Sequence, residues 1–339
     1  MKDLRNYSLL AHNTFGIEAH CRRFVEFSTI EELKSCLSSL GSEDAPLLLL
    51  GGGSNLLLTK DFEGTVLHLA IRGKEILPST EPDTVCLRCG SGEVWDEVVG
   101  WSVENDLHGM ENLSLIPGEV GASAVQNIGA YGAEAKDLIC KVEAVEIATG
   151  KEVVFTNADC AYAYRDSRFK KDWRNRFIIT YVTYRLHRTF TPDLAYGNIL
   201  SALESKGLHH PTAQQLRDTI IEIRQSKLPD PKTLGNAGSF FMNPIVEKEK
   251  FEELSALYPN MPHYTIDERH EKIPAGWMIE QCGWKGRAKG RAGVYEKQSL
   301  VLVNLGQATG AEIVALCQQV IRDVKQKFGI EIRPEVNII

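Results

Sequence analysis

The chain has 339 residues, of which 43% are hydrophobic and 24% charged, a composition typical of a globular protein with two or three domains. Thirty-eight Lys and Arg against 45 Asp and Glu leave a net charge of -7, which argues against nucleic-acid binding, because nucleic-acid-binding proteins carry a basic excess. The longest uncharged stretch, residues 45–59, is too short for a membrane helix. The N-terminus lacks an apolar signal core and the eight cysteines are scattered, so we predict a soluble cytoplasmic protein with no membrane partner.

The first half of the chain is predicted to contain one clear helix and many strands. Thr29 and Glu32 have the spacing of a capping box, which indicates a helix that continues to about Leu40. The Lys74–Asp83 stretch contains two prolines and is predicted to be a linker. The predicted strands are Leu47–Leu50, Leu56–Leu58, Thr65–Ala70, Thr84–Cys89, Val142–Ala148, Glu152–Phe155 and Phe177–Leu186.

The second half of the chain is predicted to be richer in helix. Capping pairs begin two helices, Thr212 with Gln215 and Thr309 with Glu312, and Gly329 stands where it would end the second of them. The remaining predictions are a linker at Lys227–Lys232, a helix at Val246–Leu257 and a final strand at Ile330–Ile339. Helices and strands mix without strict alternation, which predicts the α+β class.

Two glycine-rich segments are candidate anion-binding sites. Gly51–Asn55 joins two apolar runs, and Ile116–Gly132 runs from a Pro-Gly turn into small residues rich in hydrogen-bond donors. Backbone N–H groups can converge on a phosphate where no Cβ interferes. Either segment alone is as easily a tight turn, but together they predict two cradles for a pyrophosphate. Neither is a Rossmann fingerprint, since Leu56 stands where the third glycine would be.

Three residues are candidates for chemistry. The guanidinium of Arg165 suits a carboxylate bidentately, although a surface ion pair with Asp166 is the ordinary alternative. Ser239 lies among small residues and two phenylalanines, where a hydroxyl usually caps the backbone but can also protonate an acceptor as basic as a carbanion. Glu335 follows a proline in the last strand, either as an edge charge facing water or as a half-buried carboxyl.

Other polar motifs carry no chemistry in this interpretation. Cys86 and Cys89 have the spacing of half a zinc site, but a strand would direct them to opposite faces, so we predict no metal site. The basic run Lys285–Arg291 and the pair His209-His210 are interpreted as solvated surface.

Six motifs follow one another along the chain: Asn13–Phe15, Gly51–Asn55, the segment from Ile116–Gly118 to Gln126–Gly132, Tyr164–Ser167, Gly235–Phe241 and Arg333–Val336. In this order they resemble the UDP-N-acetylenolpyruvoylglucosamine reductases, flavoenzymes that reduce an enolpyruvyl ether in peptidoglycan precursor synthesis. The resemblance covers nearly the whole chain, and Tyr196 with the Lys227–Pro231 linker is similar to the longer form of the family, which has a tyrosine loop.

The resemblance implies an FAD-binding fold of the vanillyl-alcohol-oxidase-like type with three domains. These are residues 1–72 completed by 329–339, residues 73–228, and a substrate-binding domain at 229–328. It further implies non-covalent FAD, NADPH as the reductant, a UDP-sugar substrate, and a monomer with no obligate protein partner.

The resemblance also assigns roles to residues. Arg165 and a protonated Glu335 would stabilise the charge that follows hydride addition, and Ser239 would protonate the resulting carbanion. Ala122 departs from the Gly or Ser usual in the family, so we expect Ser123 and backbone N–H groups to contact the flavin. The implied FAD-binding residues are Gly51, Gly52, Gly53, Ser54, Asn55, Ile116, Gly118, Gly121, Ser123, Val125, Gln126, Asn127, Gly129 and Tyr131. The implied substrate-binding residues are Tyr196, Lys227, Asn243 and Gln298.

Two alternatives remain open. Another flavin oxidoreductase of the same fold would often attach its flavin through His or Cys, and neither occurs in Gly51–Thr59 or Ile116–Gly132. A non-catalytic UDP-sugar-binding protein would be expected to lack at least one of Arg165, Ser239 and Glu335.

Overall fold

The computed structural model describes residues 1–339 and divides into two compact units. The first unit comprises residues 1–7, 21–52 and 63–226, and the second comprises residues 8–20, 53–62 and 227–339. The last crossing of the chain between them, after Ser226, coincides with the linker predicted at Lys227–Lys232. The division of the first unit at residue 72 stays a prediction.

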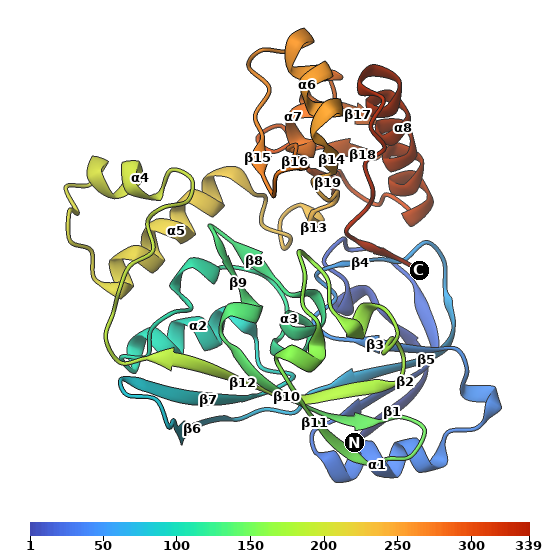
Figure 1. Ribbon diagram of the computed structural model, residues 1–339. Helices are drawn as coiled ribbons and strands as arrows, with labels where there is room; N and C mark the ends of the chain where they lie inside the picture. The colour runs from blue at the N-terminus through green and yellow to red at the C-terminus, as the bar shows by residue number, and fades with distance from the viewer. The chain divides into compact units, whose positions relative to one another are not determined.

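The first unit is built on a four-stranded sheet, β1-β2-β5-β3, and a five-stranded sheet, β11-β10-β12-β7-β6 (Figure 1). The strands wholly or mainly in this unit are β1 (Lys2–Ser8), β2 (His20–Phe27), β3 (Leu47–Leu50), β5 (Phe62–Leu69), β6 (Lys74–Pro78), β7 (Thr84–Gly90), β8 (Gly129–Ala130), β9 (Ala133–Glu134), β10 (Ile139–Glu146), β11 (Glu152–Thr156) and β12 (Phe177–His187). Its helices are α1 (Ile30–Ser39), α2 (Trp95–Glu104), α3 (Val120–Gln126), α4 (Ile199–Ser205) and α5 (Ala213–Lys227).

The core of the first unit lies where α2 and α3 cover one face of the five-stranded sheet (Figure 1). Trp95 and Tyr184 are fully buried there, with ring centroids 5.6 Å apart in an edge-on arrangement. The indole N–H of Trp95 donates to the Leu113 carbonyl at 2.9 Å, so this buried polar group keeps a partner. The packing holds α3 firmly against the sheet, and α3 carries the second glycine-rich segment.

The second unit contains two small sheets, β13-β19-β18-β17 and β14-β16-β15, and the parallel pair β20-β4. Its strands are β4 (Leu56–Leu57), β13 (Gly235–Ser239), β14 (Ile245–Glu247), β15 (Tyr264–Thr265), β16 (His270–Lys272), β17 (Ala288–Lys289), β18 (Ala292–Val294), β19 (Val301–Asn304) and β20 (Asn337–Ile338). Its helices are α6 (Lys248–Leu257), α7 (Ala275–Gln281) and α8 (Gly310–Phe328). The C-terminal strand therefore pairs with a strand from the N-terminal part of the chain.

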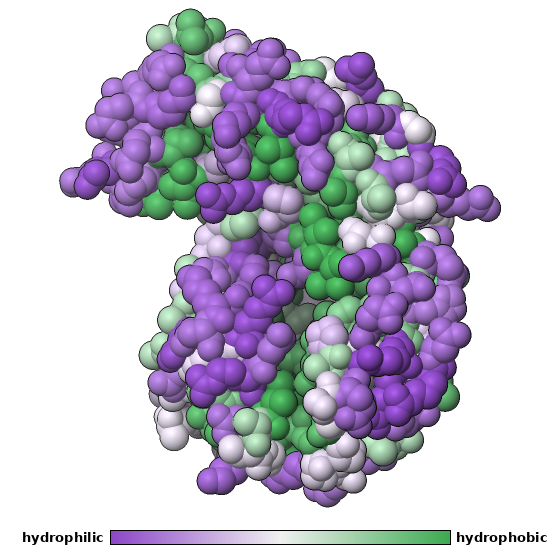
Figure 2. Space-filling view, turned by 90° about the vertical axis from the view of Figure 1, so that its right-hand side faces the viewer, coloured by the Kyte–Doolittle hydropathy of each residue, from purple (hydrophilic) through white to green (hydrophobic).

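The predicted helix caps are confirmed. Thr29 accepts a hydrogen bond from the Glu32 N–H, Thr309 accepts one from the Glu312 N–H, and Gly329 ends α8 in the left-handed region at φ 68°. None of the helices is both long and apolar enough to cross a membrane. The face of the molecule in Figure 2 carries mostly hydrophilic side chains.

Two predictions about secondary structure were wrong. The stretch Lys74–Asp83 is not only a linker, because its first half forms β6 at the edge of the five-stranded sheet and Pro78 is its last residue. Proline is tolerated there because an edge strand needs no donor on its outer side. The final strand is only Asn337–Ile338, since the chain before it forms a bridge from Pro334 to Phe241 instead.

Candidate active site

The two glycine-rich segments come together in the first unit. A Cβ on Gly51 would lie 3.2 Å from Oε2 of Glu119 and 3.6 Å from the methyl of Ala122, and a Cβ on Gly52 would lie 3.5 Å from the Cα of Gly118. The loop after β3 thus packs directly against the segment that begins α3. This close approach is what two cradles around one phosphate group require.

The first amides of α3 are already used within the protein. The N–H of Val120 donates to the Glu93 carbonyl at 2.9 Å, and that of Gly121 donates to the Ser91 carbonyl at 2.8 Å. A Cβ on Gly121 would also lie 3.0 Å from the Cβ of Ser91. Gly121 therefore serves close packing of α3 against Ser91, and its N–H is not available to a phosphate.

The hydroxyl of Ser123 corrects another expectation. Ser123 is only 1% exposed, and its Oγ donates to the Val120 carbonyl at 2.7 Å and bonds to the Tyr184 hydroxyl at 2.8 Å. The helical turn of α3 directs this side chain into the core, so the expected flavin contact through the hydroxyl is not formed by this geometry. Ile116 and Val125 likewise pack their side chains against the core of the unit.

Asn127 organises the segment that follows α3. It is fully buried with φ 47°, its Nδ2 donates to the Ala163 carbonyl at 2.8 Å, and its Oδ1 accepts the Lys136 N–H at 2.9 Å. Asparagine tolerates this left-handed conformation better than most residues. Its side chain joins the Gln126–Tyr131 segment to the hairpin that carries Arg165.

Arg165 lies at the tip of a tight hairpin closed by two hydrogen bonds between Ala163 and Asp166, and it has φ 54°. Its guanidinium donates to the backbone carbonyls of Asn127 and Gly129. The carboxylate of Asp166 pairs with Lys171, so the ordinary alternative, an Arg165–Asp166 surface pair, does not describe this arrangement. The strained backbone and the two carbonyl partners hold a half-buried guanidinium in one orientation.

Lys170 supports the same hairpin. Its Nζ donates to the Arg165 carbonyl at 2.7 Å and to Oε1 of Gln126 at 3.1 Å. Sequence analysis did not single out Lys170, because nothing in the local pattern distinguishes it from its exposed neighbour Lys171.

Two tyrosines and a second arginine gather near Arg165 in the first unit. A Cβ on Gly132 would lie 3.2 Å from the Cβ of Tyr196, so the loop containing Tyr196 contacts the segment that contains Tyr131. Burial lowers the pKa of the Arg224 guanidinium, and the nearby charge of Arg165 lowers it further, while Tyr131 is its hydrogen-bonding partner. Arg224 was not among the predicted residues, because α5 was identified only by its capping pair and no motif includes Arg224.

Ser239 is exposed at the end of β13, not buried in a turn as its surroundings in the sequence indicated. Ser239 pairs with Val301 of β19 after a register shift that begins at Asn236. The buried side chain of Asn236 accepts the Gly238 N–H at 2.9 Å and donates to the Leu234 carbonyl at 2.8 Å, and Gly238 has φ 68°. This turn presents the hydroxyl of Ser239 at the surface of the second unit.

Glu335 lies on the irregular segment before β20, next to the chain that follows Ser239. The Glu335 N–H donates to the Phe240 carbonyl at 2.8 Å, and the Glu335 carbonyl accepts Nδ2 of Asn55 at 3.3 Å. Glu335 is half-buried, so of the two interpretations of this residue the half-buried carboxyl is confirmed. The structure thus brings together three predicted residues of the second unit, Asn55, Ser239 and Glu335.

Asn243 and Gln298 each lie near the start of α7. Oδ1 of Asn243 accepts the Ala275 N–H at 2.9 Å, and a Cβ on Gly276 would lie 3.1 Å from Oε1 of Gln298. Lys227 is exposed at the end of α5, where the second unit begins.

The N-terminal motif has a structural role in the second unit. A Cβ on Gly53 would lie 1.9 Å from the His12 carbonyl oxygen, and a Cβ on Gly235 would lie 2.2 Å from that of Phe15. The Thr14 N–H donates to the Gly53 carbonyl, and the Thr14 carbonyl accepts a hydrogen bond from the Asn236 N–H. Gly53 and Gly235 are therefore positions where the backbone of residues 12–15 comes too close for a side chain.

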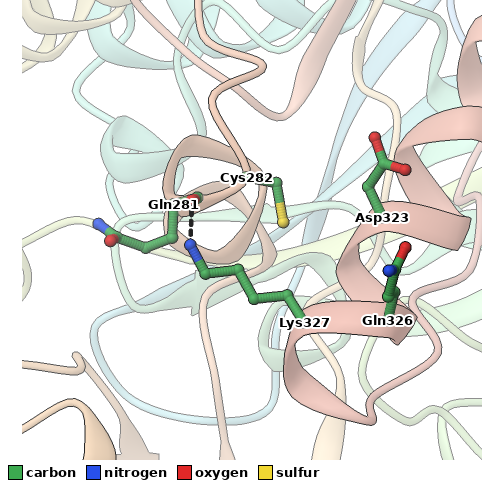
Figure 3. Close-up of a pocket in the computed structure, with 5 residues that line it drawn as sticks. All are labelled: Gln281, Cys282, Asp323, Gln326 and Lys327. Carbon is green, nitrogen blue, oxygen red and sulfur yellow. Dashed lines mark hydrogen bonds between the residues drawn. The ribbon is translucent and has the colours of Figure 1, made fainter.

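A pocket in the second unit contains none of the predicted residues. It measures about 400 Å³ and lies between the end of α7 and the last turns of α8 (Figure 3). Lys327 points across it and donates to the Gln281 carbonyl, and burial raises the pKa of the Cys282 thiol. Because the lysine is already paired and the thiol stays protonated, this pocket offers neither an unpaired cation nor a thiolate nucleophile.

Comparison with known proteins identifies the chain. Residues 230–339 match the C-terminal domain of UDP-N-acetylenolpyruvoylglucosamine reductase, and residues 21–156 match an FAD binding domain. The chain is 54% identical to the reductase of that name from Bacteroides fragilis over 99% of both chains, and 47% identical to that from Flavobacterium johnsoniae over 98% of both. The chain belongs to the UDP-N-acetylenolpyruvoylglucosamine reductase family. The resemblance that the six motifs indicated is therefore confirmed.

The fold agrees with membership of this reductase family. The crystal structure of UDP-N-acetylenolpyruvylglucosamine reductase from Thermus caldophilus superposes with a TM-score of 0.68 at 21% identity, covering 99% of this chain and 98% of the other. The predicted α+β, FAD-binding fold class is confirmed.

The first unit fits the FAD that this domain binds. The matched residues include the loop with Gly51 and Gly52 and the segment with Gly118, where a Cβ on Gly52 would lie 3.5 Å from the Gly118 backbone. The buried Oγ of Ser91, beside this segment, has no hydrogen-bond partner within the protein. An unpaired buried hydroxyl at a glycine cradle suits a polar ligand.

Proposed function

We propose that this chain reduces the enolpyruvyl group of UDP-N-acetylglucosamine enolpyruvate to give UDP-N-acetylmuramate, a step of peptidoglycan precursor synthesis, with NADPH as the reductant. Its membership of the reductase family over nearly its whole length carries the proposal. When bound beside the Gly51–Gly52 loop and the Gly118 segment, FAD would supply the redox chemistry, the transfer of a hydride from NADPH to the terminal carbon of the enolpyruvyl group. We expect the protein to act in the cytoplasm as a monomer.

Arg165 stabilises negative charge on the substrate in this proposal. Hydride addition to the terminal carbon leaves charge on the adjacent carbon and its carboxylate, and a guanidinium fork meets a carboxylate with two parallel hydrogen bonds. The carbonyls of Asn127 and Gly129 support this role, because they orient the fork before the substrate binds. A guanidinium held in advance costs little reorganisation when the charge develops.

Ser239 and Glu335 complete the chemistry in this proposal. The exposed hydroxyl of Ser239 gives its proton to the carbanion carbon, which is basic enough to accept a proton from an alcohol. Glu335 assists in its neutral form, by donating a hydrogen bond to the substrate carboxylate, since a second anion would oppose the developing charge. The hydrogen bond between the Glu335 N–H and the Phe240 carbonyl supports a shared role, because it places the two residues on adjoining segments.

Four residues are assigned to binding of the UDP-sugar. We propose that Tyr196, Lys227, Asn243 and Gln298 contact it, and that Lys227 meets its phosphates. Lys227 and Tyr196 are exposed, and Asn243 and Gln298 each lie near the start of α7, which supports contact with a ligand.

Flavin absorbance tests the proposal directly. The purified protein, saturated with FAD, should lose its yellow colour when NADPH is added without oxygen, and should regain it when UDP-N-acetylglucosamine enolpyruvate is added. Bleaching without recolouring would leave a flavoprotein that does not act on this substrate. UDP-N-acetylglucosamine, which has no enolpyruvyl group, is the matched control and should not restore the colour.

A further inference from the structure

A histidine in the first unit stands between two carboxylates beside the first glycine-rich loop. His68, on β5, is 9% exposed, and its Nδ1 lies 3.0 Å from Oε2 of Glu26 while its Nε2 lies 3.5 Å from Oε1 of Glu119. Its backbone neighbour in the parallel β3–β5 pair is Leu50, the residue before Gly51. The imidazole therefore lies next to the point where the strand becomes the glycine loop.

Glu119 connects this histidine to the loop. It precedes α3 with extended backbone and is 9% exposed, and its side chain does not cap the helix. One carboxylate oxygen faces His68, and the other lies 3.2 Å from where a Cβ of Gly51 would be. A buried carboxylate thus touches the loop in which the pyrophosphate of FAD is expected.

Such a carboxylate is unfavourable beside a phosphate unless its charge is neutralised. Two like charges a few ångströms apart in a partly buried site repel each other by several kcal/mol at an effective dielectric of about 20. An imidazolium bonded to the same carboxylate offsets that repulsion, whereas a neutral imidazole does not.

We propose that His68 is a positioning residue which, in its protonated form, neutralises Glu119 and allows the glycine loop to bind FAD, so that FAD affinity depends on the protonation of His68. The proposal rests on the function proposed above, because it requires FAD in this loop. FAD affinity is highest below the titration of His68 and falls as the pH rises through it.

The charged groups around His68 support this direction. Burial favours the neutral imidazole, but the hydrogen bonds and charges of Glu119 and Glu26 outweigh it and raise the pKa of His68 above its usual 6.5. The other strands add little, since β3 consists of leucines and Arg23 of β2 is paired with Asp3 and Asp44. Lys2 of β1 lies beyond the ring of Phe24, which packs 5.9 Å from the imidazole.

The experiment measures the dissociation constant of FAD, by quenching of flavin fluorescence on adding apoprotein, between about pH 6 and pH 8.5, where histidine titrates and the pyrophosphate does not. The wild type should bind at least about tenfold more weakly at the upper end, the factor that corresponds to about 1.4 kcal/mol. His68→Gln should bind weakly at every pH. Glu119→Gln should bind FAD tightly at every pH, and so should the double variant that combines His68→Gln with Glu119→Gln.

The double variant separates electrostatics from folding. If His68 only supported the structure, adding Glu119→Gln to His68→Gln would not restore FAD binding. Weak FAD binding by this double variant therefore overturns the proposal. A dissociation constant that is constant with pH in the wild type also overturns it, whereas a protein that binds no FAD at any pH refutes the proposed function itself. His209→Gln, an exposed histidine, is the control and should keep the wild-type pH profile.

Discussion

The two units hold their proposed functional residues in different ways. In the first unit, Arg165 is fixed by side-chain hydrogen bonds to carbonyls of a buried segment, and Asn127 secures that segment. In the second unit, backbone pairing places Ser239 and Glu335, and the serine hydroxyl is exposed. A planar fork must be oriented to match a carboxylate, whereas a proton donor needs only to reach its acceptor, so rigidity of the side chain matters more in the first unit.

The largest effect is expected from the second unit. Ser239→Ala should leave reduction of the flavin by NADPH nearly unchanged but slow its reoxidation by substrate at least about hundredfold, within the range that removal of a general acid produces. Stopped-flow absorbance of the flavin measures both half-reactions separately. Equal losses in the two would show that Ser239 is not the proton donor. Ser299→Ala, which removes a buried hydroxyl without a partner in the same unit, should change neither rate.

Replacing the guanidinium of Arg165, in the first unit, should slow flavin reoxidation somewhat less. Arg165→Lys keeps the charge but replaces two oriented N–H groups by a mobile ammonium, so reoxidation by substrate should slow about fiftyfold, corresponding to about 2 kcal/mol of charged hydrogen bonding. Arg168→Lys is the matched control, because Arg168 lies three residues after Arg165 and forms an exposed ion pair with Asp172. Turnover of R165K close to that of R168K would remove Arg165 from the mechanism.

One matched pair of asparagines tests the contrast in rigidity. Asn127→Ala should lower the free energy of unfolding by about 2 kcal/mol, because buried donors and acceptors lose their partners. Asn243→Ala, which removes one bond from the half-buried Asn243 side chain to the Ala275 N–H, should cost about 1 kcal/mol or less. Urea unfolding followed by circular dichroism measures both, and equal losses would contradict the contrast.

A smaller effect is expected on the stability of the protein in acid, where a buried carboxylate of the first unit should matter more than an exposed one of the second. Burial alone would raise the pKa of Asp44, but the Gly41 N–H and the Arg23 guanidinium outweigh it and hold this pKa below its usual 3.8. A pKa lowered in the folded state contributes stability above pH 3.8 that is lost as the pH falls through the folded-state pKa. Asp44→Asn should therefore weaken the fall in unfolding free energy below about pH 4.

The control for this effect lies in the second unit. Asp267 is exposed, and its partners are the Arg269 N–H and His270. Asp267→Asn should leave the acid limb of the stability curve unchanged, because solvent screens exposed pairs. An identical change in both variants would show that acid stability does not follow burial.

Local chemistry explains which elements were predictable. The caps at Thr29 and Thr309 act over three residues, the Leu47–Leu50 strand is one continuous apolar run, and α8 repeats its apolar positions with a period of 3.6. Their bounds were accordingly close to the prediction. The β6 strand was not predicted because the two prolines of Lys74–Asp83 indicate a break, and only the place of β6 at a sheet edge makes its one proline, Pro78, tolerable.

Residues that act through distant partners were not predictable in the same way. Ser123 looked like a ligand because it lies in a glycine-rich segment, but the orientation of α3 directs its hydroxyl to Tyr184. Glu119 and His68 have no shared motif, and Lys170 is indistinguishable in sequence from Lys171. Their roles come from segments that fold together, which no local pattern reports.

The amino-acid sequence by itself determined the family, the α+β class, the main helix caps and the identity of the residues proposed for chemistry, because motif order and periodicity are properties of neighbouring residues. The tertiary structure decided which of these residues are oriented and which are merely packed. Arg165 gains its orientation from carbonyls 36 and 38 residues away, and Glu119, at the start of α3, faces the imidazole of His68 on β5. Hydrogen bonds and charge pairs depend on distance in space, and the fold alone sets that distance.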